Sequence, residues 1–413
     1  MSILFENIGT LLTLHPLAKE KRGHSVKESD LGILKDAWLF CEQGKVSAFG
    51  TGAVSDFIKK RAQDKRDLEN AYVMPGLVDS HTHAIFGGNR YSEFVQRLNG
   101  SSYQEIAASG GGIRSTMNAT RSASDEDLIQ TTLHHIADFQ KRGVCTVEIK
   151  TGYGLSVEQE LRLARLLKNI ESQTRSHIVK TCLALHDLSP EYKRSEDYIN
   201  ALRNELLPVL IKENLVSFID AFIEKGYYAP QQVETFLLAA KKSGLGIRLH
   251  ADEFSNAEGT KYAALWGAAS ADHLQCASQE DAKALARSQT VATLLPGTSL
   301  YTGIPFTDAR MFLKAGCAVA VASDFNPGSS YVKSLAQVAS LAAIHCHLKS
   351  WEAIAGVTYV PAISLGLKGR KGAIHEGYDA DFLVYKMKGM EEWLADMGQT
   401  LPDEVWIHAE KVQ

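Results

Sequence analysis

Residues 73–83 read VMPGLVDSHTH, a short apolar run that ends in two histidines one residue apart. Such a run is typical of a buried β-strand, and a strand directs residues i and i+2 to the same side. His81 and His83 can therefore share one metal ion. Fourteen histidines in 413 residues would give roughly half such a pair by chance. The interpretation therefore needs support from the rest of the chain.

Seven further apolar runs follow, separated by helical patterns such as SVEQELRLARLLKNI. The runs are VCTVEIK, IVKTCLALH, LVSFIDAFIE, GLGIRLHADE, SADHLQ, VATLLPG and AVAVASDFNP. Eight apolar strands that alternate with helices over about 280 residues are typical of a (β/α)8 barrel. We therefore predict an α/β fold with a (β/α)8 TIM barrel, whose active site lies at the carboxyl ends of the strands.

Strand-like patterns also occur at both ends of the chain. ILFENIGTLLTL and AWLFCEQGKVSAFG near the N-terminus, and FLVY at residues 382–385, are apolar runs bounded by turn residues. Residues 16–31 between the first two patterns are polar and charged, and we expect an exposed loop there. Both ends are therefore β-rich, in contrast to the alternating middle.

The composition narrows the class of partner. A net charge of −4 gives no basic footprint for nucleic acid, and no 18-residue apolar stretch predicts a membrane span. The six cysteines lack CxxC spacing, which argues against disulfides or a thiolate zinc site and favours the cytoplasm. We expect a small-molecule substrate as the partner, and for the assembly we consider a homodimer.

Nearly every apolar run ends in a side chain that can bind a metal or move a proton. These residues are His81, His83, His186, Glu224, His250, Glu253, His273 and Asp324. The carboxyl ends of barrel strands meet at one mouth, so we expect these side chains to lie together. The first pair alone could be hydrogen-bonded without a metal, but the residues on other strands favour a metal site.

Five histidines have a plainer interpretation. His186 could be a hydrogen-bonded core residue rather than part of a site. His134 and His135 lie within a helical pattern, and we expect both at the surface. The second H-x-H pair, at residues 345 and 347, also lies in a helical pattern, where residues two apart diverge by about 200°. We interpret that pair as accidental.

The ordered set resembles the amidohydrolase superfamily, which has H-x-H after strand one, His after strands five and six, and Asp after strand eight. The resemblance covers nearly the whole chain, because the strand-like ends are similar to the small composite β-sandwich of that superfamily. It implies a sandwich domain built from residues 1–72 and 356–413 around a barrel of residues 73–355. The turn at residues 377–381, followed by FLVY, is similar to the C-terminal strand entry of that domain.

Within the superfamily, four stretches are similar to the imidazolonepropionase family. They are HAIFGGNR (83–90), GGGIR (110–114) leading to NATR (118–121), EIKTGYGL (148–155) and ASDFNPGS (322–329). The resemblance implies a cyclic amidohydrolase of histidine degradation. Such an enzyme opens 4-imidazolone-5-propanoate with metal-activated water to give N-formimidoyl-L-glutamate.

The resemblance also implies one metal ion per chain, held by His81, His83, His250 and Asp324. Relatives with two metals carry a carboxylated lysine at the end of strand four, where this chain has Ile-Glu-Lys at 223–225. Three imidazoles and one carboxylate suit Zn²⁺, with Fe or Mn as alternatives. Such an ion lowers the pKa of its bound water towards about 7.

The resemblance gives roles to further residues. His273, Asp324 and Glu253 are the catalytic candidates. His273, with His186 as a second option, would polarise the amide oxygen, and either carboxylate could carry the proton to the ring nitrogen. Arg90 can offer a bidentate partner to the propanoate, with a surface ion pair as the alternative. The implied substrate contacts are Arg90, Tyr153, His186, Glu253, Asn326, Gly328 and Ser329. We also expect the glycine-rich segment 100–121 to be a loop that closes over the substrate.

Two rival functions remain at the level of sequence. HADE at residues 250–253 also resembles the H-x-x-E of metal-dependent purine or pyrimidine deaminases in the same superfamily, which would release ammonia. A non-catalytic scaffold is the second rival. Scaffolds of this kind usually lack part of the ligand set, and this chain keeps all of it.

Overall fold

The computed structural model of the chain describes residues 2–20, 23–101, 105–106 and 109–413. Its main body is an eight-stranded parallel sheet with the strand order β12-β11-β10-β9-β8-β7-β6-β5. The strands are β5 Leu77–Asp79, β6 Val144–Lys150, β7 His177–Leu185, β8 Phe218–Ile223, β9 Gly246–Ala251, β10 Ser270–His273, β11 Val291–Leu294 and β12 Val319–Val321. Seven of these strands lie within a predicted run and β7 begins one residue before its run, so the barrel prediction is confirmed.

The barrel closes just beyond the ends of its first and last strands. Thr82 and Phe325 form an isolated parallel bridge, and the backbone N–H of His83 donates to the Phe325 carbonyl over 2.8 Å. The N–H of Asp324 donates to the His81 carbonyl over 3.0 Å. The contact that closes the barrel therefore also brings the H-x-H motif beside Asp324.

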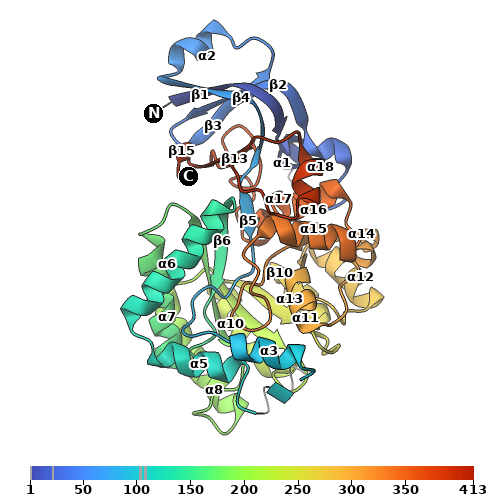
Figure 1. Cartoon of the computed structure of the whole chain (residues 1–413). Helices are drawn as coiled ribbons and strands as arrows, with labels where there is room; N and C mark the ends of the chain where they lie inside the picture. Colours follow the sequence, from blue (N-terminus) through green and yellow to red (C-terminus); the bar gives the residue numbers. More distant parts are fainter. Residues whose placement is uncertain (1, 21–22, 102–104, 107–108) are drawn as a thin grey trace.

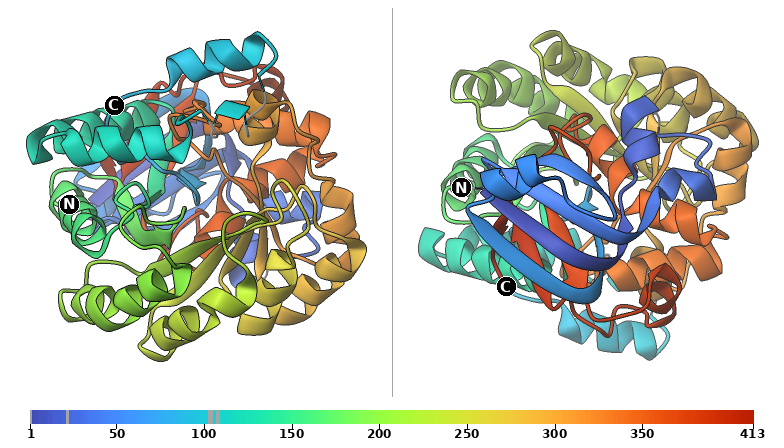
Figure 2. Two further views of the ribbon diagram at one scale, coloured as in Figure 1. Left: turned by 90° about the horizontal axis from the view of Figure 1, so that it is seen from below. Right: turned by 90° about the horizontal axis from the view of Figure 1, so that it is seen from above.

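Helices surround the sheet, as the views along the barrel show (Figure 2). They are α3 Tyr91–Leu98, α5 Ile113–Ser122, α6 Asp125–Lys141, α7 Val157–Glu171, α8 Ser195–Ala201, α9 Leu207–Lys212, α10 Pro230–Lys242, α11 Gly259–Trp266, α12 Gln279–Ser288, α13 Pro296–Thr302, α14 Ala309–Ala315, α15 Leu335–His345, α16 Ser350–Gly356 and α17 Tyr359–Ser364. None of the described helices is both long and apolar enough to cross a bilayer.

Local sequence fixes where the helices α6 and α7 begin. Ser124 Oγ accepts from the N–H of Asp127 at the start of α6, and Ser156 Oγ accepts from the N–H of Gln159 at the start of α7. These caps satisfy N–H groups that a first helical turn leaves without an internal partner. The apolar face of α7, which includes Leu163, then packs into the main core.

The two ends of the chain form one mixed seven-stranded sheet with the order β15-β14-β13-β4-β1-β2-β3. Its strands are β1 Ser2–Leu12, β2 Ile33–Glu42, β3 Lys45–Thr51, β4 Asp64–Pro75, β13 Phe382–Tyr385, β14 Glu404–Ile407 and β15 Glu410–Lys411. Phe5, Phe382 and Trp406 pack their rings together in its core. The composite domain from both termini is thus confirmed, although its strands are hydrogen-bonded in one sheet. The domain limits at 72/73 and 355/356 stay predictions.

The terminal sheet lies at the end of the barrel opposite α3 and α5 (Figure 1). Strand β4 leads directly into β5 through Gly76, whose N–H donates to the Asp381 carbonyl over 2.9 Å. A Cβ on Gly76 would lie 2.5 Å from the Sγ of Cys145, so only glycine fits this junction. The sheet therefore braces the amino ends of the barrel strands and leaves the mouth open.

Two local expectations were wrong. Within residues 16–31, α1 (His15–Glu20) and a 3-10 turn (Glu28–Leu31) place Leu17 and Leu31 in the core, because tertiary packing overrides the polar composition around these two leucines. The expected loop at 100–121 contains helix α5 from residue 113 onward. Part of that segment, residues 102–104 and 107–108, lies outside the described residues.

Candidate metal centre and active site

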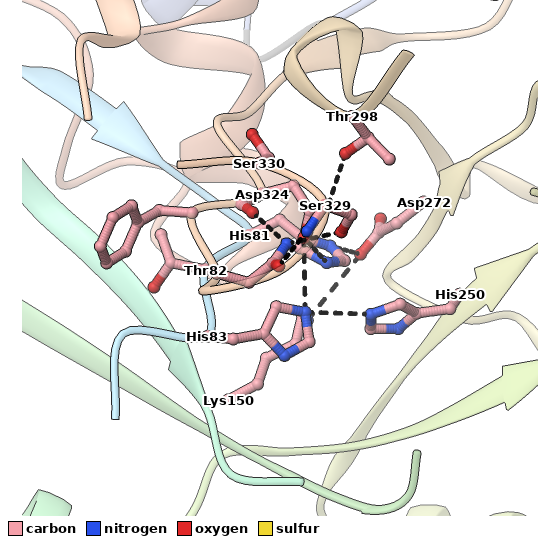
Figure 3. Close-up of polar contacts among 12 residues, drawn as sticks. His81, Thr82, His83, Lys150, His250, Asp272, Thr298, Asp324, Ser329 and Ser330 are labelled. Atoms are coloured by element: carbon pink, nitrogen blue, oxygen red, sulfur yellow. Dashed lines mark hydrogen bonds and ion pairs between the residues drawn. The ribbon is translucent and has the colours of Figure 1, made fainter. Parts of the chain in front are cut away.

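The four predicted metal ligands lie around one point at the mouth of the barrel (Figure 3). Asp324 Oδ1 lies 3.5 Å from His81 Nε2 and 3.4 Å from His83 Nε2. Nε2 of His250 lies 3.3 Å from Nε2 of His83. Four ligand atoms placed about 2.0–2.1 Å from a tetrahedral zinc ion would lie about 3.3–3.4 Å apart. The spacing of these four side chains therefore fits a single ion.

The tautomers of two of these histidines also fit a metal. Nδ1 of His81 lies 2.8 Å from Asp272 Oδ2, and Nδ1 of His250 lies 3.1 Å from Asp220 Oδ2. Asp272 accepts a hydrogen bond, so Nδ1 of His81 carries the proton, and the carboxylate beside Nδ1 of His250 favours the same tautomer there. Each Nε2 then presents a lone pair to the cluster. His81 Nε2 is buried and has no hydrogen-bond partner among the described residues. A cation would satisfy that atom.

Burial keeps the clustered imidazoles neutral. Desolvation, with the charge of Lys150 and the neighbouring histidines, lowers the pKa of His81 well below its usual range. The pKa of His83 is lowered well below its usual range for similar reasons, with burial first. Burial also lowers the pKa of His273 to about 3, against the opposing effect of Asp324. Neutral imidazole is the form that binds metal.

A layer of buried charges lies behind the histidines. Lys150 Nζ lies 2.8 Å from Glu148 Oε1 and 2.9 Å from Asp220 Oδ2. Arg248 Nη2 lies 3.3 Å from Asp272 Oδ2. All five side chains are fully buried, so each charge depends on its partners. The two cations thereby hold the two carboxylates that orient His81 and His250.

The carboxylate of Asp324 is fixed from its second oxygen. Thr298 Oγ1 donates to Asp324 Oδ2, which leaves Oδ1 for the histidine side of the cluster. Asp324 and His273 have φ angles of +52° and +83°. Non-glycine residues in this region cost about 1–3 kcal/mol each and concentrate at functional sites.

A pocket opens over the cluster, and a concave site with converging polar groups suits a small ligand. Its lining is His83, Arg90, Ile113, Tyr153, His186, Phe222, His250, Glu253, Phe254, His273, Asp324, Asn326 and Ser329. The structure therefore brings nearly all predicted site residues into one pocket. Gly328 is outside this lining but packs against Arg90, since a Cβ there would lie 1.9 Å from Arg90 Nη1.

The other predicted polar residues hold loops or rings around the pocket. His186 stacks on His83 with ring centroids 4.9 Å apart, and its Nδ1 lies 3.1 Å from the Gly152 carbonyl. Glu253 is buried, and desolvation with the charges of Asp324 and Glu224 raises its pKa well above the usual range. Glu224 itself accepts the backbone N–H groups of residues 254 and 255. Glu224 therefore stabilises the loop that contains residues 254 and 255.

The remaining histidines were expected in helices or at the surface, and the structure confirms this only in part. His345 ends helix α15 and His347 lies beyond it, so they do not share one helix as expected. Both are exposed. His134 is exposed, but His135 is only 4% exposed and its Nδ1 lies 3.0 Å from the Ala84 carbonyl. The surface prediction for His135 was wrong because its side of α6 faces the barrel.

Sequence reasoning missed the supporting carboxylates and cations. Asp220 and Asp272 lie inside apolar runs, one or more residues before the strand end, and Glu148 and Arg248 also lie within strands. The signal that could have found them is a charged residue in an otherwise apolar barrel strand, because such a residue must be paired inside the barrel. Thr298 gives no comparable signal.

The fold and the site define a class. The family model of the amidohydrolase family matches residues 72–408 of this chain, which spans the barrel and the strands β13 and β14 of the terminal sheet. The chain belongs to the amidohydrolase family.

Two bacterial relatives narrow this class. The imidazolonepropionase of Pseudomonas aeruginosa (strain UCBPP-PA14) is 42% identical over 392 residues, which cover 94% of this chain and 96% of the relative. That of Bdellovibrio bacteriovorus is 40% identical over 414 residues, with 100% of this chain and 95% of the relative covered. Within the amidohydrolases, the chain therefore belongs with the imidazolonepropionases.

A more distant solved structure shares the fold. The adenosine deaminase from Xanthomonas campestris, solved with bound zinc, aligns with a TM-score of 0.70 at 17% identity and covers 99% of this chain and 92% of its own. At this identity the likeness shows the fold alone. The buried His/Asp cluster of this chain is of the metal-site type, and this structural relative holds zinc.

Proposed function

We propose that this enzyme hydrolyses the cyclic amide of 4-imidazolone-5-propanoate to N-formimidoyl-L-glutamate. One water adds across the ring C–N bond of the amide, and no group leaves the molecule. The family supplies the reaction, and the pocket supports it, because the His/Asp cluster and the Arg90 guanidinium face the same space. Hydrolysis of a cyclic amide that carries a carboxylate requires the cluster at the amide and the guanidinium at the carboxylate.

In this proposal His81, His83, His250 and Asp324 hold one ion per chain, zinc or iron. The donor set of imidazole and carboxylate, the spacing of 3.3–3.5 Å and the unsatisfied Nε2 of His81 support it. When bound, such an ion lowers the pKa of a water towards about 7 and so makes a nucleophile available at neutral pH.

His273 is proposed to donate a hydrogen bond to the amide oxygen as that oxygen gains negative charge. The low pKa of His273, about 3, keeps it a neutral donor throughout the working pH range. Its Nδ1 is buried without a hydrogen-bond partner among the described residues and lies 3.6 Å from Glu253 Oε1. A preorganised donor of this kind is worth about 3–4 kcal/mol in the transition state.

Two carboxyl groups divide the proton transfer. Asp324 is proposed to accept the proton of the attacking water, because it lies against the histidine cluster. Glu253 is proposed to hold a proton and give it to the leaving ring nitrogen. Its burial and raised pKa favour the protonated form that a general acid requires.

The remaining pocket residues are proposed to bind the substrate. Arg90 would meet the propanoate carboxylate, with Gly328 allowing its close approach. Asn326 Oδ1 accepts the N–H groups of Gly328 and Ser329 over 2.8 and 2.7 Å, so one side chain fixes this wall. Tyr153 and His186, 5.3 Å apart between ring centroids, would flank the ring.

The decisive experiment combines freshly generated 4-imidazolone-5-propanoate with metal-replete enzyme and weighs the product. A mass gain of one water without ammonia, lost in His273→Ala at unchanged metal content, supports the proposal. Release of ammonia from a purine or pyrimidine instead would favour deamination. No turnover by protein with its metal bound would refute the proposed reaction.

Three broader assignments are proposals of the same kind. We propose the two-part division at residues 72/73 and 355/356, a homodimer and a cytoplasmic location. All six cysteines are free, which supports a reducing compartment. Limited proteolysis, sedimentation velocity and cell fractionation test the three assignments in turn.

A further inference from the structure

We propose that Glu93 is a positioning residue that aims Arg90 at the carboxylate of the substrate and links it to the start of helix α5. This inference rests on the proposed function, and within it adds the residue that sets specificity for an acidic side chain. Glu93 lies in the first turn of α3, and only 5% of it is exposed.

Both oxygens of the Glu93 carboxylate are engaged. Oε2 accepts from Arg90 Nε over 2.7 Å, and Oε1 accepts from the backbone N–H of Gly112 over 3.1 Å. Two donors from different segments fix the plane of the carboxylate, and a charge-assisted bond in a buried site resists rotation. Glu93 therefore cannot turn away without leaving a buried donor unsatisfied.

This arrangement decides which edge of Arg90 meets the ligand. Because Glu93 occupies the Nε edge, the Nη groups are directed to the side of Gly328, where a Cβ would lie 1.9 Å from Nη1. A guanidinium presents two edges to planar acceptors, and holding one of them orients the other. Arg97 Nη2 donates to the Gly328 carbonyl over 2.8 Å, so α3 holds both sides of this subsite.

The second oxygen connects the subsite to the rim of the pocket. Gly112, with φ of +71°, is the N-cap of α5, and the next residue, Ile113, lines the pocket. The position of Ile113 therefore depends on the same carboxylate that orients Arg90. Glu93 therefore connects the anionic subsite to this rim.

A simple charge effect would predict the opposite outcome. Glu93 is an acid near a site for an anion, so neutralising it should strengthen binding if charge alone mattered. Glutamine at this position replaces one acceptor oxygen with an NH2 donor, so either Arg90 Nε or the Gly112 N–H would face another donor. The positioning role therefore predicts weaker binding in Glu93→Gln, which separates the two explanations by sign.

The test measures kcat and KM of Glu93→Gln and Glu93→Asp with 4-imidazolone-5-propanoate and with 5-ethyl-4-imidazolone, which lacks the carboxylate. Aspartate keeps the charge but is one methylene too short to span both donors. We expect KM for the acidic substrate to rise about tenfold in both variants, with kcat within about twofold. Values for the ethyl compound should not change. Glu126→Gln, an exposed position on α6, is the matched control.

A KM that stays constant or falls in Glu93→Gln overturns the inference while the proposed function stands. If the wild type does not hydrolyse the acidic substrate, the proposed function fails. Ligand binding then tests the role of Glu93 by itself. Calorimetry then compares imidazole-4-propanoate with 4-ethylimidazole. The role of Glu93 is supported if the wild type binds the propanoate more tightly and both variants lose this preference. It is refuted if the variants keep the preference, or if the wild type has none.

Discussion

Lys150→Met tests the buried charge layer behind the proposed metal ligands. Burial opposes the charged form of Lys150, but the carboxylates of Asp220 and Glu148 outweigh it and raise the pKa of the lysine. Methionine fills a similar volume without a charge. The variant therefore leaves two buried carboxylates facing an apolar side chain.

The magnitude follows from how many partners remain. Removing one partner of a buried ion pair costs about 3–5 kcal/mol. Lys150 serves Glu148 at 2.8 Å and Asp220 at 2.9 Å, while Arg248 Nε, at 3.9 Å from Glu148 Oε1, compensates only part of the loss. We expect the free energy of unfolding to fall by about 4 kcal/mol.

Urea unfolding followed by circular dichroism measures this difference. The matched control is Arg165→Met, which removes an exposed ion pair with Glu213 at 2.7 Å and should leave the transition unchanged. Metal content is the second readout, because Asp220 orients His250 and loss of such support costs about 10–100-fold in metal affinity. A stability loss below about 1 kcal/mol with unchanged metal affinity would refute the reasoning.

Three further outcomes follow from the structure. Removing the metal with a chelator should abolish ring opening, and added zinc or ferrous iron should restore it; full activity in protein free of metal by mass spectrometry would contradict the proposed centre. Gly328→Ala should raise KM about tenfold or more, because its Cβ would lie 1.9 Å from Arg90 Nη1 and would force the guanidinium out of place; an unchanged KM would count against that contact. Burial, with the charges of Lys371 and Arg370, lowers the pKa of His177 to about 4. The unfolded chain therefore binds the proton first, so stability is full above about pH 6.5 and is lost as the pH falls to about 4. His177→Gln should flatten this dependence in thermal melts from pH 4 to 7, and identical slopes would disprove it.

The sequence was most informative where a residue type and a strand end coincide. His81, His83, His250, His273 and Asp324 could be assigned to one mouth because parallel strands bring their carboxyl ends together. Glu224, which also follows a strand, instead accepts the N–H groups of a neighbouring loop. A strand end predicts position but not the partner of the side chain.

Helical residues were predicted less well. His135 and the segment at 113–122 depend on which side of a helix faces the barrel, and a polar sequence with a few apolar positions leaves that side undecided. Leu17 and Leu31 were missed for the same reason, since short elements are stabilised by the core they contact rather than by their own composition.

The sequence by itself determined the eight strands, the order of the ligand residues along them and the family, because strand periodicity and motif order are local properties of the chain. Only the tertiary structure decided which carboxylate supports which histidine, that Thr298 fixes Asp324, and that Glu93 holds both Arg90 and Gly112. These contacts join segments whose packing sets distances of a few ångströms. Hydrogen bonds and ion pairs depend on such distances, and residue order alone does not specify them.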